Sequence, residues 1–169
     1  MPIQDVEHPY PLIDSDPHFS RVIRYMRPVD LGIWAGVTAF MPALVRVWEH
    51  VDTSGATKKQ LRTAVRLNTS LGFIAGFLWA YQNSSKRFWG WSENAAEVEK
   101  DFTELSALAK AGKPLYGESA LDAYGQSVAA GNSQWSALKF QTLPWFNFAN
   151  HPFHGVDTSK YYESSQKPS

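Results

Sequence analysis

Cysteine is absent from the 169 residues of this chain. Its absence excludes disulfide bonds, thiolate-bound iron–sulfur clusters and thiol catalysis. Net charge is absent as well, because sixteen basic side chains balance sixteen acidic ones. Proteins that bind nucleic acid usually carry a basic patch or a basic overall balance. We therefore expect no nucleic-acid partner.

Strongly apolar runs of 18 residues or more are also absent, although two borderline runs occur. The first is uncharged from Leu31 to Val45, which as a helix is about 22 Å long and shorter than the ~30 Å hydrocarbon core of a bilayer. Extending it to residues 29–48 gives about 20 residues, the length of a membrane span. The second is uncharged over residues 67–85, roughly 28 Å as a helix, and is strongly apolar only in its middle. We predict that both runs cross a membrane.

Each predicted span carries a Gly-x-x-x-Gly motif, formed by Gly32 and Gly36 in the first and by Gly72 and Gly76 in the second. Small residues at this spacing let helix backbones approach closely where lipid supplies no hydrophobic drive. We expect these glycines to pack within the hairpin or on a partner. The short loop between the spans makes them antiparallel neighbours. The predicted fold class is an all-α membrane protein built on a two-helix transmembrane hairpin; buried helices of a soluble α-protein are the alternative.

An arm flanks the predicted hairpin on each side. Residues 1–28 contain five prolines, which interrupt any long helix and predict an extended N-terminal arm. Residues 86–163 are predicted to form a partly helical C-terminal arm. Apolar residues at spacings of three and four indicate an amphipathic helix over 93–110. Shorter helices are predicted over 119–131 and 133–140.

One segment of the C-terminal arm, residues 143–154, concentrates aromatic side chains between two prolines. It is too interrupted for a regular helix and too apolar to be left in water, so we expect it to lie on a protein or membrane surface. The predicted docking residues are Trp145, Phe146, Phe148 and Phe153. Residues 164–169 are small and polar, which predicts a disordered tail.

The sequence contains one cluster with metal-ligand chemistry. His151 and His154 form a His-x-x-His pair with Asp157 nearby, but a structural role is favoured because a helical frame and further ligands are missing. Phosphate-loop, serine-hydrolase and zinc-protease motifs do not occur. Lys86 and Arg87, at the end of the second span, are expected to contact lipid headgroups. We predict no catalytic residue, no metal site and no cofactor.

Several segments of unusual composition resemble a known family. They are HPYPLID (8–14), AYQNSSKRFWGW (80–91), GKPLYG (112–117) and PWFNF (144–148), the last followed by HP and HGVD. These segments resemble the NUXM family of accessory subunits of fungal mitochondrial respiratory complex I, and the similarity runs nearly end to end. The resemblance implies a subunit of the inner mitochondrial membrane with two transmembrane helices and no redox centre. The implied partners are other complex I subunits of the membrane arm and membrane lipids.

The predicted function is that of a non-catalytic scaffold that supports assembly of NADH:ubiquinone oxidoreductase. Arms rich in proline and aromatic residues bury little in a core of their own and gain order when they bind a large complex. The alternative from another class is a small inner-membrane translocase or assembly component with a glycine-packed hairpin. A soluble lipid- or ligand-binding α-protein is the third hypothesis.

Overall fold

The computed structural model describes residues 8–52, 55–139 and 144–166, and six helices lie within them. The chain divides into two compact units. The hairpin unit is Met26–Ser84, and the arm unit combines Met1–Tyr25 with Ser85–Ser169. The two arms that we predicted separately, 1–28 and 86–163, therefore belong largely to one unit. Each unit is described by itself.

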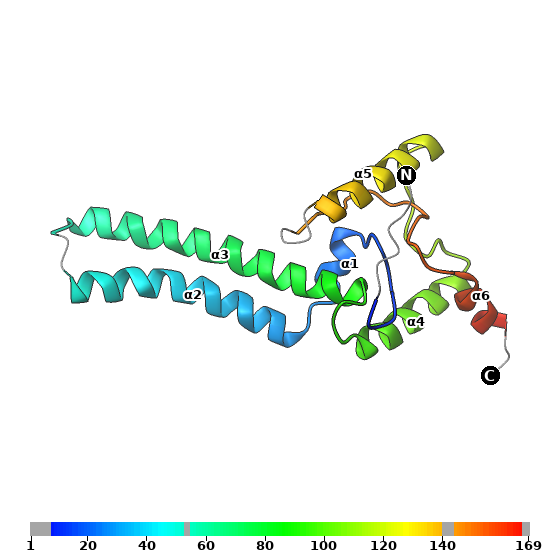
Figure 1. The fold of residues 1–169 in the computed structure, drawn as a ribbon, viewed down its shortest axis with the longest axis horizontal. Helices are drawn as coiled ribbons and strands as arrows, with labels where there is room; N and C mark the ends of the chain where they lie inside the picture. Colours follow the sequence, from blue (N-terminus) through cyan, green and yellow to red (C-terminus); the bar gives the residue numbers. More distant parts are fainter. Residues whose placement is uncertain (1–7, 53–54, 140–143, 167–169) are drawn as a thin grey trace. The chain divides into compact units, whose positions relative to one another are not determined.

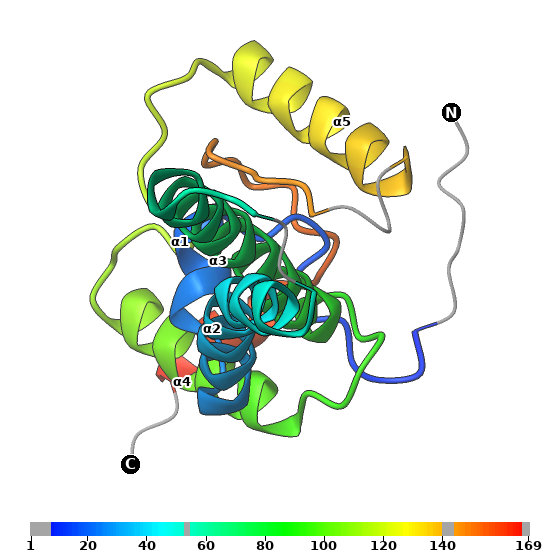
Figure 2. The ribbon, with the colours of Figure 1, turned by 90° about the vertical axis from the view of Figure 1, so that its left-hand side faces the viewer.

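The hairpin unit consists of α2 (Pro28–Val51) and most of α3 (Lys58–Phe88). Pro28 occupies the first turn of α2, where a missing N–H is harmless, and the Asp30 carboxylate accepts the N–H of Arg27 at 2.8 Å. The two helices lie side by side and run in opposite directions (Figures 1 and 2). The predicted hairpin pairing is therefore confirmed.

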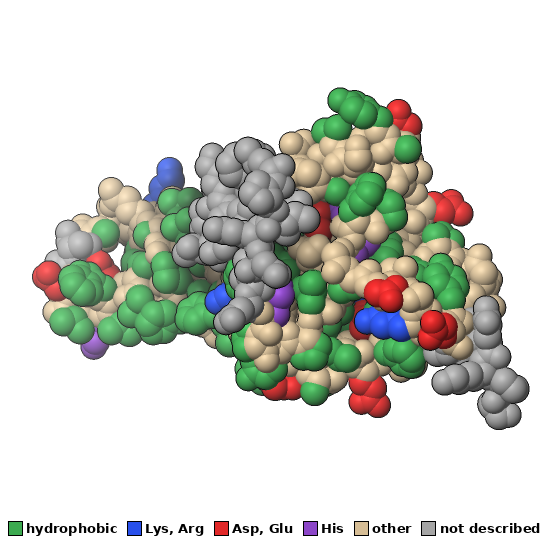
Figure 3. All heavy atoms as spheres, turned by 45° about the vertical axis from the view of Figure 1, so that its right-hand side comes forward, with side chains coloured by type: hydrophobic (Ala, Val, Ile, Leu, Met, Phe, Trp, Pro, Cys, Tyr) green, Lys and Arg blue, Asp and Glu red, His purple; other side chains and the backbone are tan. Residues whose placement is uncertain are grey.

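Among the described residues, α2 alone is long and apolar enough to cross a membrane. Its 24 residues span about 36 Å and contain the predicted first span, 29–48. Apolar side chains cover much of the outer surface of the hairpin, seen at the left of Figure 3. The predicted second span, 67–85, lies inside α3. The basic residues in the first half of α3 make that helix more polar than α2, and its insertion into a membrane is taken up below as a proposal.

The arm unit contains α1 (Phe19–Arg24), α4 (Ala95–Lys110), α5 (Ala123–Lys139) and α6 (Ser159–Gln166). The predicted helix 93–110 is confirmed as α4, which begins two residues later. A small apolar core of Leu105, Leu115 and Tyr161 joins α4 to α6.

Two predictions for the arm unit are corrected by the structure. In place of separate helices over 119–131 and 133–140, α5 is one helix to Lys139, and Phe140 lies outside the described residues. The helix passes through Gly131 because an interior glycine costs only about 1 kcal/mol, whereas a proline would cost about three times as much. In place of a disordered end from Ser164, α6 continues to Gln166, and residues 167–169 lie outside the described part.

The N-terminal segment of the arm unit runs along the end of α3 and the turn that follows it. The Tyr10 N–H donates to the carbonyl of Gly90, and the Ile13 N–H donates to that of Phe88, both at 3.0 Å. Gly90 has a φ of +69°, and a Cβ at that position would lie 2.4 Å from the Tyr10 carbonyl oxygen. Only glycine fits there, because it tolerates positive φ and lets another backbone approach closely.

Candidate functional site

A network of buried charges joins four elements of the arm unit. The Arg21 guanidinium, on α1, donates to the Asp14 carboxylate at 2.6 Å and is also hydrogen-bonded to Asp101 on α4. The Tyr161 hydroxyl, on α6, donates to the second oxygen of Asp101 at 2.6 Å. All four side chains are buried. Buried charges need such partners, and removing one partner of a buried pair typically costs about 3–5 kcal/mol.

Aromatic rings surround the Arg21 guanidinium. Its central carbon lies 5.3 Å from the ring centres of Phe88 and Tyr116 and 5.8 Å from that of Tyr25, distances at which a cation is attracted to a ring face. Burial raises the pKa of the Tyr25, Tyr116 and Tyr161 phenols above the usual range. These phenols therefore stay neutral at physiological pH, and those of Tyr25 and Tyr161 donate hydrogen bonds to Glu104 and Asp101.

The two histidines of the His-x-x-His pair are buried and hydrogen-bonded to the N-terminal segment. His154 Nδ1 lies 2.7 Å from the Asp14 carboxylate, and His151 Nε2 lies 2.8 Å from that of Asp16. The side chain of Asp157 points elsewhere: it caps α6 by accepting hydrogen bonds from Ser159, which lower the pKa of the Asp157 carboxyl. Within the described residues no three His, Asp or Glu side chains are placed to hold a metal ion.

The aromatic segment lies against the N-terminal segment of the same unit. The Phe19 N–H donates to the Asn147 carbonyl at 2.7 Å, and the rings of Phe146 and Phe148 lie 5.5 and 4.8 Å from the Phe19 ring. The described part, Pro144 to His154, forms no helix, as predicted; residue 143 lies outside it. This pairing could not be predicted from the sequence, because the two segments lie more than a hundred residues apart.

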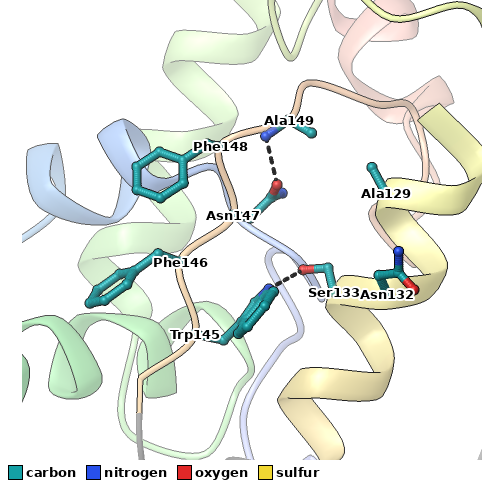
Figure 4. Close-up of a pocket in the computed structure, with 8 residues that line it drawn as sticks. All are labelled: Ala129, Asn132, Ser133, Trp145, Phe146, Asn147, Phe148 and Ala149. Atoms are coloured by element: carbon teal, nitrogen blue, oxygen red, sulfur yellow. Dashed lines mark hydrogen bonds between the residues drawn. The ribbon is translucent and has the colours of Figure 1, made fainter. Parts of the chain in front are cut away.

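Much of the predicted docking surface is nevertheless open to solvent. Phe148 is 68% exposed, Phe153 52% and Trp145 38%, whereas Phe146 is half-buried. Behind this segment lies a cavity of about 340 Å³ between α5 and the aromatic residues (Figure 4). In it the Trp145 indole N–H donates to the Ser133 hydroxyl at 3.0 Å. None of the eight described lining residues has an acidic or basic side chain.

The two glycine motifs of the hairpin unit have different surroundings. A Cβ at Gly72 would lie 2.8 Å from the Val37 carbonyl oxygen, and one at Gly76 would lie 2.8 Å from that of Trp34. These glycines therefore form the contact of α3 with α2. At Gly32 and Gly36 a Cβ would meet nothing within 4 Å. The motif of α2 thus takes no part in packing within the hairpin.

Comparison with known proteins identifies the family. Residues 7–93 match the family described as the 21 kDa subunit of NADH-ubiquinone oxidoreductase complex I, and residues 102–168 match the C-terminal region of the same subunit. The NADH-ubiquinone oxidoreductase 20.9 kDa subunit of Neurospora crassa is 51% identical over 160 residues, which cover 94% of this chain and 84% of that protein. The chain belongs to the complex I 21 kDa subunit family.

Membership in the 21 kDa subunit family confirms the resemblance found in the sequence. It makes this chain an accessory, non-catalytic subunit of mitochondrial NADH-ubiquinone oxidoreductase, located at the inner mitochondrial membrane, and makes other complex I subunits its partners. It also decides against the translocase and the soluble-protein hypotheses. The two matched regions are joined in the structure, because His154 and Asn147 of the second region bind Asp14 and Phe19 of the first.

The basic pair at the end of α3 differs from the expectation for a lipid contact. Arg87 is buried, and its Nε lies 3.0 Å from a carboxylate oxygen of Glu97 on α4. Arg87 therefore forms a buried ion pair inside the arm unit of this complex I subunit. Lys86 is half-buried. Sequence reasoning missed the ion pair because the turn at Gly90, which reverses the chain between Arg87 and Glu97, was not predicted.

Proposed function

We propose that both α2 and α3 cross the inner mitochondrial membrane, so that this subunit is a multi-pass hairpin in the membrane arm of complex I. There it supports assembly and stability by binding neighbouring subunits and lipids. The proposal rests on which segments form the arm unit. This unit combines the chain that precedes α2 with the chain that follows α3.

The two ends of the hairpin are held in one folded unit. Phe19 and Asn147 share a backbone hydrogen bond, and Arg21 and Asp101 share a buried ion pair. A chain that leaves this unit through α2 and crosses the bilayer has to cross it again to return. Between α2 and the arm unit, α3 is the segment that is long enough to cross the bilayer. A membrane-spanning α2 therefore requires a membrane-spanning α3.

The polar side chains of α3 are compatible with a lipid environment. Asn68, Thr69 and Ser70 each donate a hydrogen bond to the carbonyl four residues earlier, at 2.8 to 3.2 Å. The Trp34 indole N–H, on α2, donates to the carbonyl of Phe73 at 3.0 Å. Such bonds satisfy groups that would otherwise be costly in hydrocarbon. They support α3 as a span despite its modest apolar content.

We assign the contacts with partners to two surfaces. The first is the face of α2 that carries Gly32 and Gly36, which is free of contacts within the hairpin and suits close approach by another helix. The second is the aromatic segment, where Trp145, Phe148 and Phe153 expose large apolar rings. Phe146 supports the second surface from beneath. Lys86 is proposed as the contact for a lipid headgroup.

A labelling experiment tests the topology. The chain has no cysteine, so single cysteines can be placed at the exposed positions Ser20, Asp52 and Lys113 and probed in sealed inner-membrane vesicles with an impermeant maleimide. The proposal expects Ser20→Cys and Lys113→Cys to react from one side and Asp52→Cys from the other. Reaction of Asp52→Cys and Lys113→Cys from the same side would show that α3 does not cross.

An assembly experiment tests the two surfaces. Gly36→Leu, and the double variant of Trp145→Ala with Phe148→Ala, are expressed in cells that lack the native subunit. Gly36→Leu should weaken association because the larger side chain keeps a partner helix from approaching closely. The aromatic double variant should weaken association by a few kcal/mol, as truncation of buried interface anchors does. The measurement is the share of subunit that stays with complex I on native gels in mild and harsher detergent. Tyr124→Ala is the control, because Tyr124 is 76% exposed and lies on neither surface. Retention of both variants at the control level would contradict the assignment.

A further inference from the structure

The surroundings of His154 determine its protonation state. Its Nδ1 lies 2.7 Å from a carboxylate oxygen of Asp14, and its Nε2 lies 2.6 Å from the backbone carbonyl oxygen of His151. A carbonyl oxygen only accepts hydrogen bonds, so Nε2 has to carry a proton. The state of Nδ1 depends on whether Asp14 accepts or donates.

The remaining partners of Asp14 are all donors. The Arg21 guanidinium donates to one carboxylate oxygen at 2.6 Å, and the backbone N–H of Asp16 donates to the other at 2.9 Å. The adjacent Arg21 guanidinium favours the ionised form of Asp14, and an ionised carboxylate accepts from each neighbour. Nδ1 of His154 then has to carry a proton as well, which makes the ring a cation.

The neighbouring histidine gives the contrasting case. His151 Nδ1 accepts the backbone N–H of Phe153 at 3.2 Å. Its Nε2 faces the Asp16 carboxylate at 2.8 Å, with the Asn147 amide nitrogen farther away at 3.3 Å. One nitrogen accepts and the other donates, which is the pattern of a neutral imidazole. The two rings lie stacked 4.9 Å apart. The same motif thus contains one neutral histidine and one charged histidine.

Charge balance around the site agrees with this assignment. The side chains that face His154 are Asp14 from the N-terminal segment, Tyr116, whose ring is stacked 3.5 Å away, and the stacked ring of His151. Arg21 from α1 lies behind Asp14 and also binds Asp101 from α4, where the neutral Tyr161 of α6 completes the network. Two cations, Arg21 and His154, then face the carboxylates of Asp14 and Asp101, as buried charges require. The third carboxylate, that of Asp16, is held by hydrogen bonds from His151 and Ser133.

We infer that His154 is held as a buried imidazolium, and that its proton fastens the aromatic segment to the N-terminal segment. The Ser15 N–H donates to the His154 carbonyl at 2.9 Å beside the ring, so this residue is one of the points at which the two segments meet. Loss of the proton to hydroxide forms water and leaves a nitrogen lone pair facing an oxygen at 2.6 or 2.7 Å. That repulsion would open the contact. The exposed aromatic surface is consequently sensitive to alkaline pH.

Nuclear magnetic resonance tests the protonation state directly. The full chain, labelled with ¹⁵N-histidine, is studied in detergent micelles, and the His151 and His154 rings are assigned through His151→Gln and His154→Gln. An ordinary exposed imidazole titrates near about 6.5. At a pH just above neutrality we expect two protonated nitrogens on His154 and one on His151. A single protonated nitrogen on His154 under these conditions would overturn the inference.

Limited proteolysis tests the consequence. Chymotrypsin cleavage after Phe146 and Phe148 is compared with cleavage after Tyr124, an exposed site on α5 that corrects for the pH dependence of the protease. The ratio should rise several-fold in the wild type as the pH is raised from neutral into the alkaline range. In His154→Gln, which has no proton to lose in this range, the ratio should be high throughout. A wild-type ratio that stays constant over the range would show that the proton does not fasten the segment.

Discussion

The contact of α3 with α2 at Gly72 and Gly76, here called the glycine seam, can be tested by a comparison in which the motif of α2 is the control. Gly76 lies against α2, whereas Gly36 lies on the opposite face of α2 with open space around it. Gly76→Ala and Gly36→Ala make the same chemical change in the two helices of one hairpin. We expect Gly76→Ala to loosen the seam and Gly36→Ala to leave it intact.

The magnitude follows from the distances. A Cβ at position 76 would lie 2.8 Å from the Trp34 carbonyl oxygen and 3.0 Å from Cδ1 of its ring. Non-bonded atoms are comfortable at about 3.5 Å or more, so the helices have to separate by about 0.7 Å. Overpacking of this kind costs about 1–3 kcal/mol. The gain of about 1 kcal/mol in helix propensity is common to both variants. The difference in unfolding free energy between them therefore isolates the packing cost, about 1–3 kcal/mol.

Trp34 provides the signal for this measurement. Its ring lies 5.0 Å from that of Phe73 and 5.2 Å from that of Phe77, so its environment reports on the seam. The full chain is labelled with fluorotryptophan in detergent, its Trp34 resonance is assigned by loss in Trp34→Phe, and the protein is titrated with sodium dodecyl sulfate. Equal midpoints for Gly76→Ala and Gly36→Ala would refute the proposed geometry of the seam. A lower midpoint for Gly36→Ala alone would show that α2 packs on α3 through the face that carries Gly36, contrary to the structure.

Two further predictions concern the arm unit, both measured by chemical denaturation of the full chain in detergent. Arg21→Met should lower the unfolding free energy by about 3–5 kcal/mol, because it leaves the buried Asp101 carboxylate without a counter-charge and removes the guanidinium that binds Asp14. Arg24→Met, which removes an exposed pair with Glu104, should cost less than about 1 kcal/mol. The raised pKa of the Tyr161 and Tyr116 phenols predicts a loss of stability as the pH rises above about 10, because the unfolded phenols ionise there and the folded ones do not. The loss should be smaller in Tyr161→Phe, and an equal loss in that variant would contradict the assignment.

The parts of the fold that depend on short-range patterns were predictable. Apolar spacing identified α4, and the combination of length, charge and glycine spacing identified the paired helices α2 and α3. Helix ends were less accurate, because α3 begins at Lys58 although the apolar run begins only at Leu67. Basic residues with good helix propensity extend the helix beyond the apolar run.

The candidate site could not be predicted because its contacts span most of the chain. Asp14 and His154 are separated by 140 residues and Arg21 and Asp101 by 80. Periodicity reports only on neighbours three or four residues apart. A histidine pair in a segment without helix signals could equally bind a metal or a carboxylate, and only the folded structure identifies Asp14 and Asp16 as the partners. The same limit explains why Arg87 was assigned to lipid when Glu97 holds it.

The hairpin and the arm unit depend on each other through chain connectivity. A two-helix hairpin with borderline spans has little to prevent the second helix from slipping out of the bilayer. Here the chain on both sides of the hairpin is joined by buried ion pairs at Arg21 and by the backbone bond between Phe19 and Asn147. In the proposed topology that closure compensates for the polar residues of α3, because withdrawal of α3 from the bilayer would require the arm unit to come apart. Arg21→Met should therefore increase extraction of the isolated subunit from membranes by alkaline carbonate, although the residue lies outside both helices. Unchanged extraction would show that the hairpin is retained by its own apolar surface alone.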